Sequence, residues 1–278
     1  MTGKSKGMRL AYVYLSLYSV FNLLVFVWIF LTAMKGQSEF FATSPWSPPE
    51  AFNLTNFKEA WKVGHIGEFF ANSAYVTGIS TVVCLVVSSM AAYILGRIPF
   101  RGRGIVQLVF MLGMMVPPFM IVIPLFSVLD SLLLLNSLNG LVLVYVTIQI
   151  PMNVYVLTSF YRSLPTEFEE AAAIDGASPL RTFFTIMMPL TMPALAACAI
   201  INILAFWNEF LFALVFLGDK TKLTLPIGLF YLNQGAEYSG KWTILFAGMA
   251  ISCIPVLLLL ALFQKQFSRG ISQGAIKL

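Results

Sequence analysis

Six long apolar runs constrain this chain more than any other feature of its sequence. Each run has about 20 or more mostly apolar residues, enough for a helix to cross roughly 30 Å of hydrocarbon. The runs lie near residues 10–34, 72–95, 105–129, 139–160, 194–217 and 243–263. A segment in lipid must satisfy its own backbone hydrogen bonds, so each run is predicted to be helical. The predicted fold class is an all-α integral membrane protein with six transmembrane helices.

The composition excludes the main soluble classes. Hydrophobic residues make up 59% of the chain, charged residues only 10%, and the mean hydropathy is +0.85. Even a large soluble domain buries only about 75% of the surface of its unfolded chain, which leaves too much apolar surface exposed here. A soluble enzyme, a disulfide scaffold and a disordered protein are therefore excluded. Cys84, Cys198 and Cys253 lie in apolar runs and predict neither disulfides nor a metal cluster.

Basic residues predict the orientation of the spans. Six spans place both termini on one side, and eleven of the 17 Lys and Arg residues fall on that side. Arg97, Arg101 and Arg103 stand within seven residues there. The basic excess predicts that both termini are cytoplasmic. The first run is predicted to be an uncleaved span, because its apolar core is longer than the roughly 7–15 residues of a signal peptide.

The predicted organisation has two parts. Residues 1–71 hold the first span and a long external segment, and residues 72–278 hold the other five spans. The second part includes a cytoplasmic pair of short helices at about 165–188 and a cytoplasmic tail at 264–278.

The first short helix is predicted from local signals. Thr166 and Glu169 have the spacing of a capping box, so a helix is expected to begin there. Three alanines, residues 171–173, favour helix formation, and Gly176 is expected to end it.

The second short helix is predicted to begin at Ser178, with Pro179 at its first position. Pro189 and Pro193 are expected to end it before the next span. An apolar stripe with i, i+3, i+4, i+7 spacing follows the start, comprising Leu180, Phe183, Phe184 and Met187.

A capped segment with an apolar face favours a docking element for another protein. The alternative is a helix pair lying on the lipid. Against that alternative, four acids would face an anionic leaflet, namely Glu167, Glu169, Glu170 and Asp175.

The same segment resembles the EAA signature of permeases of ATP-binding cassette (ABC) importers. The signature runs EAA, three residues, Gly, nine residues, Ile, any residue, Leu-Pro. The matching residues are Glu170, Ala171, Ala172, Gly176, Ile186 and Pro189, with Met188 in place of the usual Leu. Flanking motifs resemble the second permease of maltose-type systems, including 100–103, 115–118, 123–126, 135–143, 207–211 and 270–277.

The resemblance implies the type I ABC importer permease fold, with the short helices fitting a cleft on a cytoplasmic ATPase. Glu170 and Gly176 are then the central coupling positions, with Glu169 and Asp175 as neighbours. Two ATPase subunits would use ATP and Mg, and this chain would bind no cofactor and be no enzyme. Its only Gly-Lys-Ser, residues 3–5, lacks the glycine that a phosphate-binding loop needs five residues earlier.

The resemblance also implies the other partners and the location. These are a second related permease, an extracytoplasmic solute-binding protein and a sugar, with a di- or oligosaccharide expected, in the cytoplasmic (inner) membrane of a prokaryote. No nucleic-acid partner is expected. The alternative is a self-sufficient secondary transporter or channel for a small polar solute, which predicts several intramembrane ionisable groups or an internal repeat.

Polar groups within the spans have two possible roles. Trp207, Asn208 and Glu209 could line the translocation path, or Glu209 could pair with a neighbouring helix and Trp207 could pack at the interface. Asn153 and Asn202 could bind a sugar or join helices, and joining is favoured.

Prolines predict broken or kinked helices near the path. They are Pro117, Pro118 and Pro124 in the third run and Pro151 in the fourth.

The external connection at 218–241 is predicted to be polar and flexible. Its candidate contacts with the solute-binding protein, by resemblance, are Asn233, Gln234, Gly235 and Glu237. An ordinary turn is the alternative.

Overall fold

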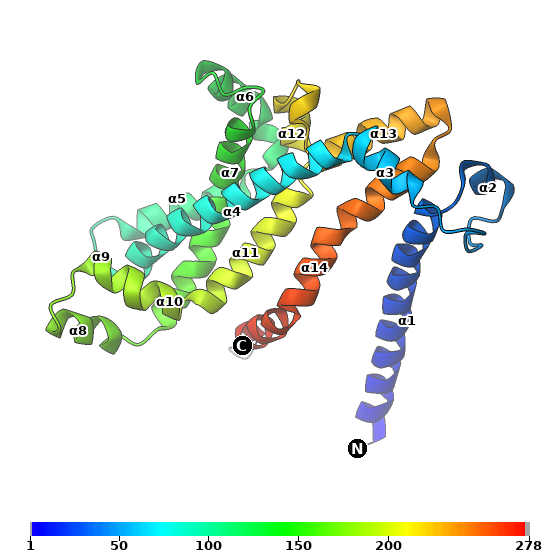
Figure 1. Cartoon of the computed structure of the whole chain (residues 1–278). Helices are drawn as coiled ribbons and strands as arrows, with labels where there is room; N and C mark the ends of the chain where they lie inside the picture. The colour runs from blue at the N-terminus through cyan, green and yellow to red at the C-terminus, as the bar shows by residue number, and fades with distance from the viewer. Residues whose placement is uncertain (1, 276–278) are drawn as a thin grey trace. The chain divides into compact units, whose positions relative to one another are not determined.

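Every regular element in residues 2–275, the range that the computed structural model describes, is a helix. Side chains are described for Met8 and for residues 10–263. The α-helices, labelled in Figure 1, are α1 Thr2–Ala33, α2 Gln37–Ala42, α3 Thr55–Lys62, α4 Ile66–Arg97, α5 Arg103–Met115, α6 Val122–Ser131, α7 Leu138–Ser163, α8 Glu167–Ile174, α9 Pro179–Thr182, α10 Met188–Leu190, α11 Met192–Trp207, α12 Leu211–Phe216, α13 Leu225–Ser239 and α14 Trp242–Ala275. The all-α prediction is confirmed.

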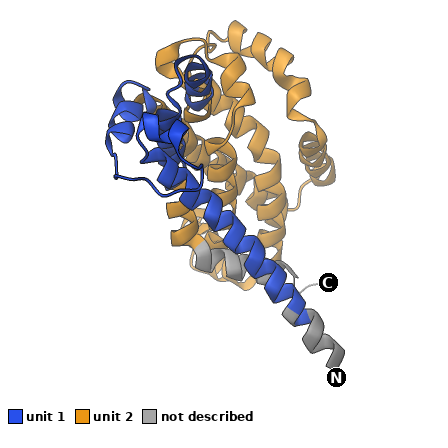
Figure 2. Ribbon diagram, turned by 90° about the vertical axis from the view of Figure 1, so that its right-hand side faces the viewer, with its two compact units in different colours: residues 1–67, 228–254 blue, residues 68–227, 255–278 orange. Residues whose placement is uncertain are grey.

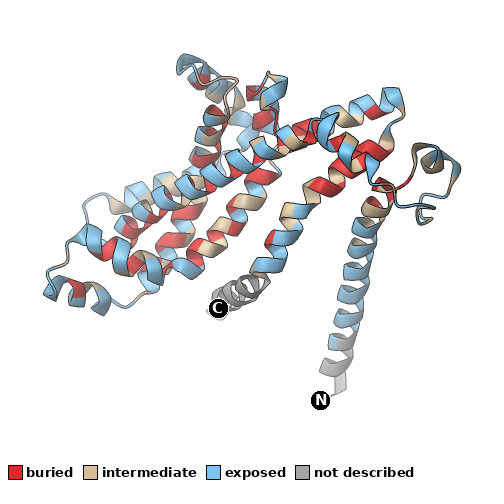
Figure 3. Cartoon of the chain, in the orientation of Figure 1, coloured by how far each residue is buried: buried red, intermediate tan, exposed pale blue. Residues whose placement is uncertain are grey.

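Four of these helices are long and apolar enough to cross a membrane. They contain the stretches Leu10–Ala33, Ile66–Arg97, Leu138–Ser163 and Trp242–Phe263. Two bent helix pairs raise the number to six if each pair counts as one span. Most of α1 is exposed (Figure 3), as expected for a helix whose apolar surface faces lipid or another subunit.

The third apolar run is broken, as its prolines predict. Helix α5 ends at Met115, a 3₁₀ turn covers Pro118–Ile121, and α6 begins at Val122. The two arms are bent by 97°. Pro117 is extended, with φ −64° and ψ 131°, because the residue before a proline is pushed out of the helical region.

Of the two predicted outcomes at Pro151, a break or a kink, the break does not occur, because α7 runs unbroken from Leu138 to Ser163. The pyrrolidine ring packs against α5 where Gly113 leaves room for it. A Cβ at Gly113 would lie 3.3 Å from Pro151 Cγ. Close helix packing therefore holds the proline within the helix.

The prediction of one helix across 194–217 is also wrong. Helix α11 ends at Trp207, and α12 begins at Leu211. Glu209 lies in the gap, and its carboxylate accepts hydrogen bonds from the N–H groups of Phe212 at 2.8 Å and Ala213 at 3.1 Å. A side-chain acceptor at this position favours a new helix start over continuation of α11.

The chain forms two compact units (Figure 2). One comprises residues 1–67 and 228–254, and the other comprises residues 68–227 and 255–278. The sequence-based division at residue 71 did not group residues 228–254 with the N-terminal segment. In the first unit, Asn56 Nδ2 donates to the carbonyl oxygens of Ala33 and Lys35, both at 2.8 Å, which ties α3 to the end of α1.

The second unit has a core at the end that carries the short helices. Tyr93 of α4 packs against Tyr161 of α7 and against Phe183, with ring centroids 5.5 and 5.2 Å apart. Tyr161 is fully buried, and its hydroxyl lies 2.7 Å from Ser89 Oγ. Other buried members of this cluster are Ala92, Leu157, Met187, Ala194, Leu195 and Cys198.

Candidate functional site

The predicted first short helix is present as α8. It begins at Glu167, and Gly176 follows its end with a left-handed φ of +73°, a conformation that glycine adopts readily. The predicted capping box is wrong, because Thr166 makes no side-chain cap. Glu169 turns instead to Arg97.

The predicted second helix begins as expected. Ser178 Oγ accepts a hydrogen bond from the Arg181 N–H at 3.3 Å, and Pro179 opens α9. Helical structure continues one residue past Pro189 to Leu190, so the segment ends between Pro189 and Pro193, before α11 begins at Met192, as predicted. A π-helical turn over Phe183–Met187 precedes Pro189. This wider turn gives the ring room that a regular α-helix lacks.

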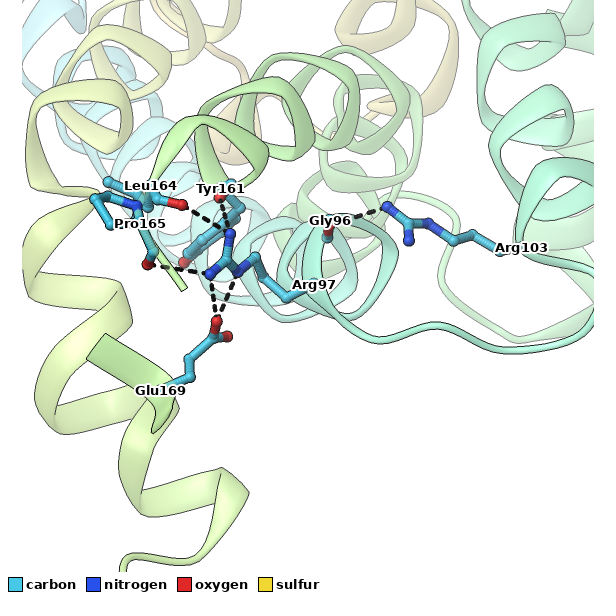
Figure 4. A network of polar contacts seen from close by, with 7 residues as sticks. All are labelled: Gly96, Arg97, Arg103, Tyr161, Leu164, Pro165 and Glu169. Carbon is cyan, nitrogen blue, oxygen red and sulfur yellow. Dashed lines mark hydrogen bonds and ion pairs between the residues drawn. The ribbon is translucent and has the colours of Figure 1, made fainter. Parts of the chain in front are cut away.

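Arg97 fastens α8 to the helices behind it (Figure 4). Its Nε donates to Glu169 Oε2 at 2.8 Å, and its Nη2 makes a second, shorter contact with the same oxygen. The guanidinium also donates to the carbonyl oxygens of Leu164 at 2.8 Å and Pro165 at 3.1 Å, with a longer bond of 3.4 Å to Tyr161. The Arg97 side chain is only 7% exposed. A planar guanidinium with five donors suits this role.

Two further arginines bind carbonyl groups at the C-terminal end of α4. Arg103 Nη2 donates to the Gly96 carbonyl at 2.9 Å (Figure 4), and Arg162 Nη2 donates to that of Leu95 at 3.5 Å. Cations near these last carbonyls also interact favourably with the helix dipole. The basic residues that predict the orientation therefore also stabilise the end of the helix.

The predicted apolar stripe of the second helix divides between core and surface. Phe183 and Met187 are buried in the core cluster, whereas Leu180 is 62% and Phe184 46% exposed. Ile186 is half-buried and packs against the cluster. The segment is therefore anchored on one side and leaves apolar side chains uncovered on the other.

Four of the eight predicted coupling residues are exposed on α8 and on the turn that links it to α9. Glu170, Ala171, Asp175 and Gly176 are exposed, and Ile174 between them is 86% exposed. Three other predicted members differ: Ala172 is buried, Glu169 is bound to Arg97, and Pro189 lies in α10 beyond the π turn.

The predicted path residues have separate surroundings. Asn153 is buried, and its Nδ2 donates to Cys84 Sγ at 3.1 Å. Asn202 is fully buried on α11. Trp207 is buried edge-on against Phe70.

The other two path residues lie at the break after α11. Asn208 is exposed and donates to the Leu204 carbonyl at 2.8 Å. Glu209 binds the Tyr145 hydroxyl at 2.7 Å, in addition to the α12 amides. The alternative role of Glu209, pairing with a neighbouring helix, matches this geometry.

The external connection is mostly helical, which corrects the prediction of a flexible segment. Asn233, Gln234, Gly235 and Glu237 lie on α13, where Asn233 Nδ2 donates to Glu237 Oε1 at 3.2 Å. Gln234, Gly235 and Glu237 are exposed.

A turn at Asp219 precedes α13. The Asp219 carboxylate accepts hydrogen bonds from the Thr221 N–H at 2.9 Å and hydroxyl at 2.8 Å. Hydrogen bonding from Thr221, the backbone N–H first, lowers the pKa of Asp219 below its usual 3.8.

Sequence reasoning missed two residues that position these groups. Arg97 was noted only as a positive charge, and Tyr145 not at all. The close spacing of Arg97, Arg101 and Arg103 was the available signal for the first. A tyrosine in an apolar run gives no sign of its partner 64 residues away.

Residues 86–273 match the family model described as the inner membrane component of binding-protein-dependent transport systems. The chain belongs to this family. The matched range contains α8, the left-handed Gly176 and the π turn, so the EAA-like segment lies within it. The family description implies a solute-binding protein and partner ATPase components for this permease.

The permease is similar to proteins of sugar uptake systems. It is 35% identical to a diacetylchitobiose uptake permease of Streptomyces coelicolor, over 95% of this chain and 87% of that protein. It is 36% identical to a trehalose/maltose transport permease of Thermococcus litoralis, over 77% and 76%. A solved bacterial ABC transporter that imports alginate contains a chain of the same fold, with TM-score 0.85 and 23% identity over 95% of this chain and 98% of that one.

Proposed function

We propose that this permease is a transmembrane subunit of a sugar importer and that its substrate is a di- or oligosaccharide. The named relatives support this assignment, since they belong to uptake systems for diacetylchitobiose and for trehalose and maltose. The chain resembles them over most of its length, so the likeness covers the spans as well as the cytoplasmic segment.

The anchored cytoplasmic segment is the coupling element of this proposal. Arg97 and the core cluster hold one side of α8–α10, while Glu170, Ile174 and Gly176 stay exposed. A displacement of the exposed side would be transmitted to α4 and α7 through the Arg97 guanidinium. Two partner ATPases would cause this displacement when they bind ATP and Mg and close together.

The remaining partners follow from the family. A second, related permease completes the membrane part, and an extracytoplasmic binding protein delivers the sugar, with α13 as a contact candidate. The proposed orientation places both termini in the cytoplasm, in the inner membrane of a prokaryote. Residues 276–278 of the predicted cytoplasmic tail lie outside the described residues, and the rest of the tail belongs to α14.

Co-purification and transport in proteoliposomes test the proposal. The chain, expressed with its neighbouring reading frames, should retain an ATPase in mild detergent, and uptake should require both ATP and the binding protein. Glu170→Lys should leave the complex in the membrane but uncouple uptake from ATP hydrolysis, because it reverses a charge on the exposed surface. Solute accumulation by this chain alone would refute the proposal.

Gly176 allows a sharper version of this experiment. Gly176→Val should abolish coupling, since a β-branched residue is strained at φ +73°. Gly176→Asn is the matched control for the backbone, because Asn adopts this conformation more readily. If uptake fails in both variants, Gly176 is required for direct contact with the partner ATPase. If uptake fails in the Val variant but not in the Asn variant, Gly176 is required for the left-handed turn.

A further inference from the structure

The first compact unit contains a cavity with mainly aromatic walls, and this cavity takes no part in the proposed coupling. Its volume is about 380 Å³, and it lies among the end of α1, α2 and the start of α14. Its lining includes Trp28, Thr32, Lys35, Phe40, Trp242 and Phe246. Because these residues stand at the same ends of two spans, the cavity lies at a membrane–water interface, where tryptophans are common.

Lys35 places a positive charge at this cavity. It is only 1% exposed. Its Nζ donates to Ser44 O at 3.0 Å, Ser47 Oγ at 3.0 Å and Thr43 Oγ1 at 3.3 Å. These three neutral oxygens satisfy the N–H groups but leave the charge uncompensated.

No carboxylate pairs with this ammonium in the described part of the chain. The acid of α2, Glu39, is turned to the backbone N–H groups of Gly36 at 3.0 Å and Glu50 at 2.7 Å. A buried charge without a counter-ion is costly, so an anion in the cavity would stabilise this region.

A second polar group faces the same space. Thr32 lines the cavity and is 2% exposed, and its hydroxyl has no hydrogen-bond partner among the described residues. A hydroxyl buried in this way usually has a hydrogen-bond partner, and a phosphate or ester oxygen can accept a hydrogen bond from it.

The rest of the lining distinguishes between anionic ligands. Trp28 packs edge-on against Phe246, with centroids 5.2 Å apart, and its Nε1 is already bonded to Pro45 O at 2.7 Å. A free sugar needs several polar partners, and this wall is mainly aromatic. We propose that the cavity binds the phosphate and glycerol region of an anionic phospholipid, with the phosphate near Lys35 and Thr32.

Native mass spectrometry of the purified full chain tests this proposal. Protein exchanged into micelles with equal amounts of phosphatidylglycerol and phosphatidylcholine should retain the anionic lipid preferentially. Lys35→Gln should lower that retention about tenfold, because it removes the positive charge that attracts the phosphate. Thr32→Val should also lower it, and Lys35→Arg should preserve it. Lys58→Gln, an exposed lysine of α3, is the matched control and should have no effect.

Three results would overturn the proposal. They are equal retention of both lipids, unchanged retention in both Lys35→Gln and Thr32→Val, and binding of glycerol phosphate as tight as that of the lipid. The last result would assign the cavity to a soluble phosphate ester. If Lys35→Gln does not fold, Thr32→Val and the comparison of the two lipids on the unmodified chain decide the question.

Discussion

Arg97, at the C-terminal end of α4, binds the carboxylate of Glu169 in α8, and the two residues are 72 positions apart. The same guanidinium binds the carbonyl oxygens of Leu164 and Pro165, which connect α7 to α8. One side chain therefore joins two long helices, α4 and α7, to α8. Figure 4 shows that Glu169 reaches this site from α8. A rigid connection of this kind can transmit displacement, whereas a loop would absorb it.

Replacing Arg97 should lower the free energy of unfolding more than removing the charge of Glu169. Arg97→Met loses the ion pair and two short carbonyl bonds, and we expect it to lower the free energy of unfolding by about 2–3 kcal/mol. Glu169→Gln keeps an acceptor and should cost less. Denaturant titration in mixed micelles measures both effects. The double variant should be less destabilised than the sum of the single variants, and simple additivity would contradict the direct interaction.

Gly96 should tolerate a larger side chain poorly, because α4 and α7 approach closely there. A Cβ at Gly96 would lie 3.0 Å from Tyr161 Cβ. Gly96→Val should therefore destabilise the protein by about 1–3 kcal/mol. Gly78→Val, in the same helix with nothing within 4 Å of its Cβ, is the matched control and should change stability little. Equal thermal midpoints in detergent for the two variants would disprove the close contact.

The Tyr145–Glu209 bond should contribute measurably to stability. Tyr145 is buried, and its hydroxyl is 2.7 Å from the Glu209 carboxylate. Tyr145→Phe should lower the free energy of unfolding by about 1–2 kcal/mol, because the half-buried Glu209 carboxylate loses one of its donors. Tyr75→Phe removes a bond of the same length to Asn139 from a tyrosine that is 44% exposed, so it should cost far less. Chemical unfolding curves compare the two, and a larger loss at Tyr75 would contradict the assigned burial.

The turn at Asp219 should loosen in acid. Its pKa is lowered in the folded chain, so the carboxylate stabilises the turn above the usual value of 3.8 and loses this effect as pH falls through the lowered pKa. Hydrogen exchange of the Thr221 amide should therefore be faster, after correction for intrinsic rates, at roughly pH 2 than at roughly pH 6. Asp219→Asn should remove most of this pH dependence. A protected Thr221 amide at low pH would show that the carboxylate does not hold the turn.

The fold class and the position of the segment α8–α10 along the chain follow from sequence patterns alone. Apolar runs of span length need internally bonded backbones, so helices followed directly. Local chemistry was enough to predict the start of α9 at Ser178, whose side chain caps that helix. It was also enough to predict the end of α8, because Gly176 adopts the left-handed backbone that follows it. At Pro117 and Pro118 the covalent geometry of proline was enough to predict the break after α5.

The partner that each polar group takes depends on the packing of distant parts of the chain. Thr166 and Glu169 have the local spacing of a cap, yet a buried guanidinium from α4 takes the carboxylate. Pro151 stays within α7 because Gly113 of another helix makes room for it. Glu209 lies between α11 and α12. Its carboxylate accepts hydrogen bonds from the Phe212 N–H of α12 and from the Tyr145 hydroxyl of α7. These outcomes depend on contacts between residues far apart in the chain, and local patterns carry no information about such contacts.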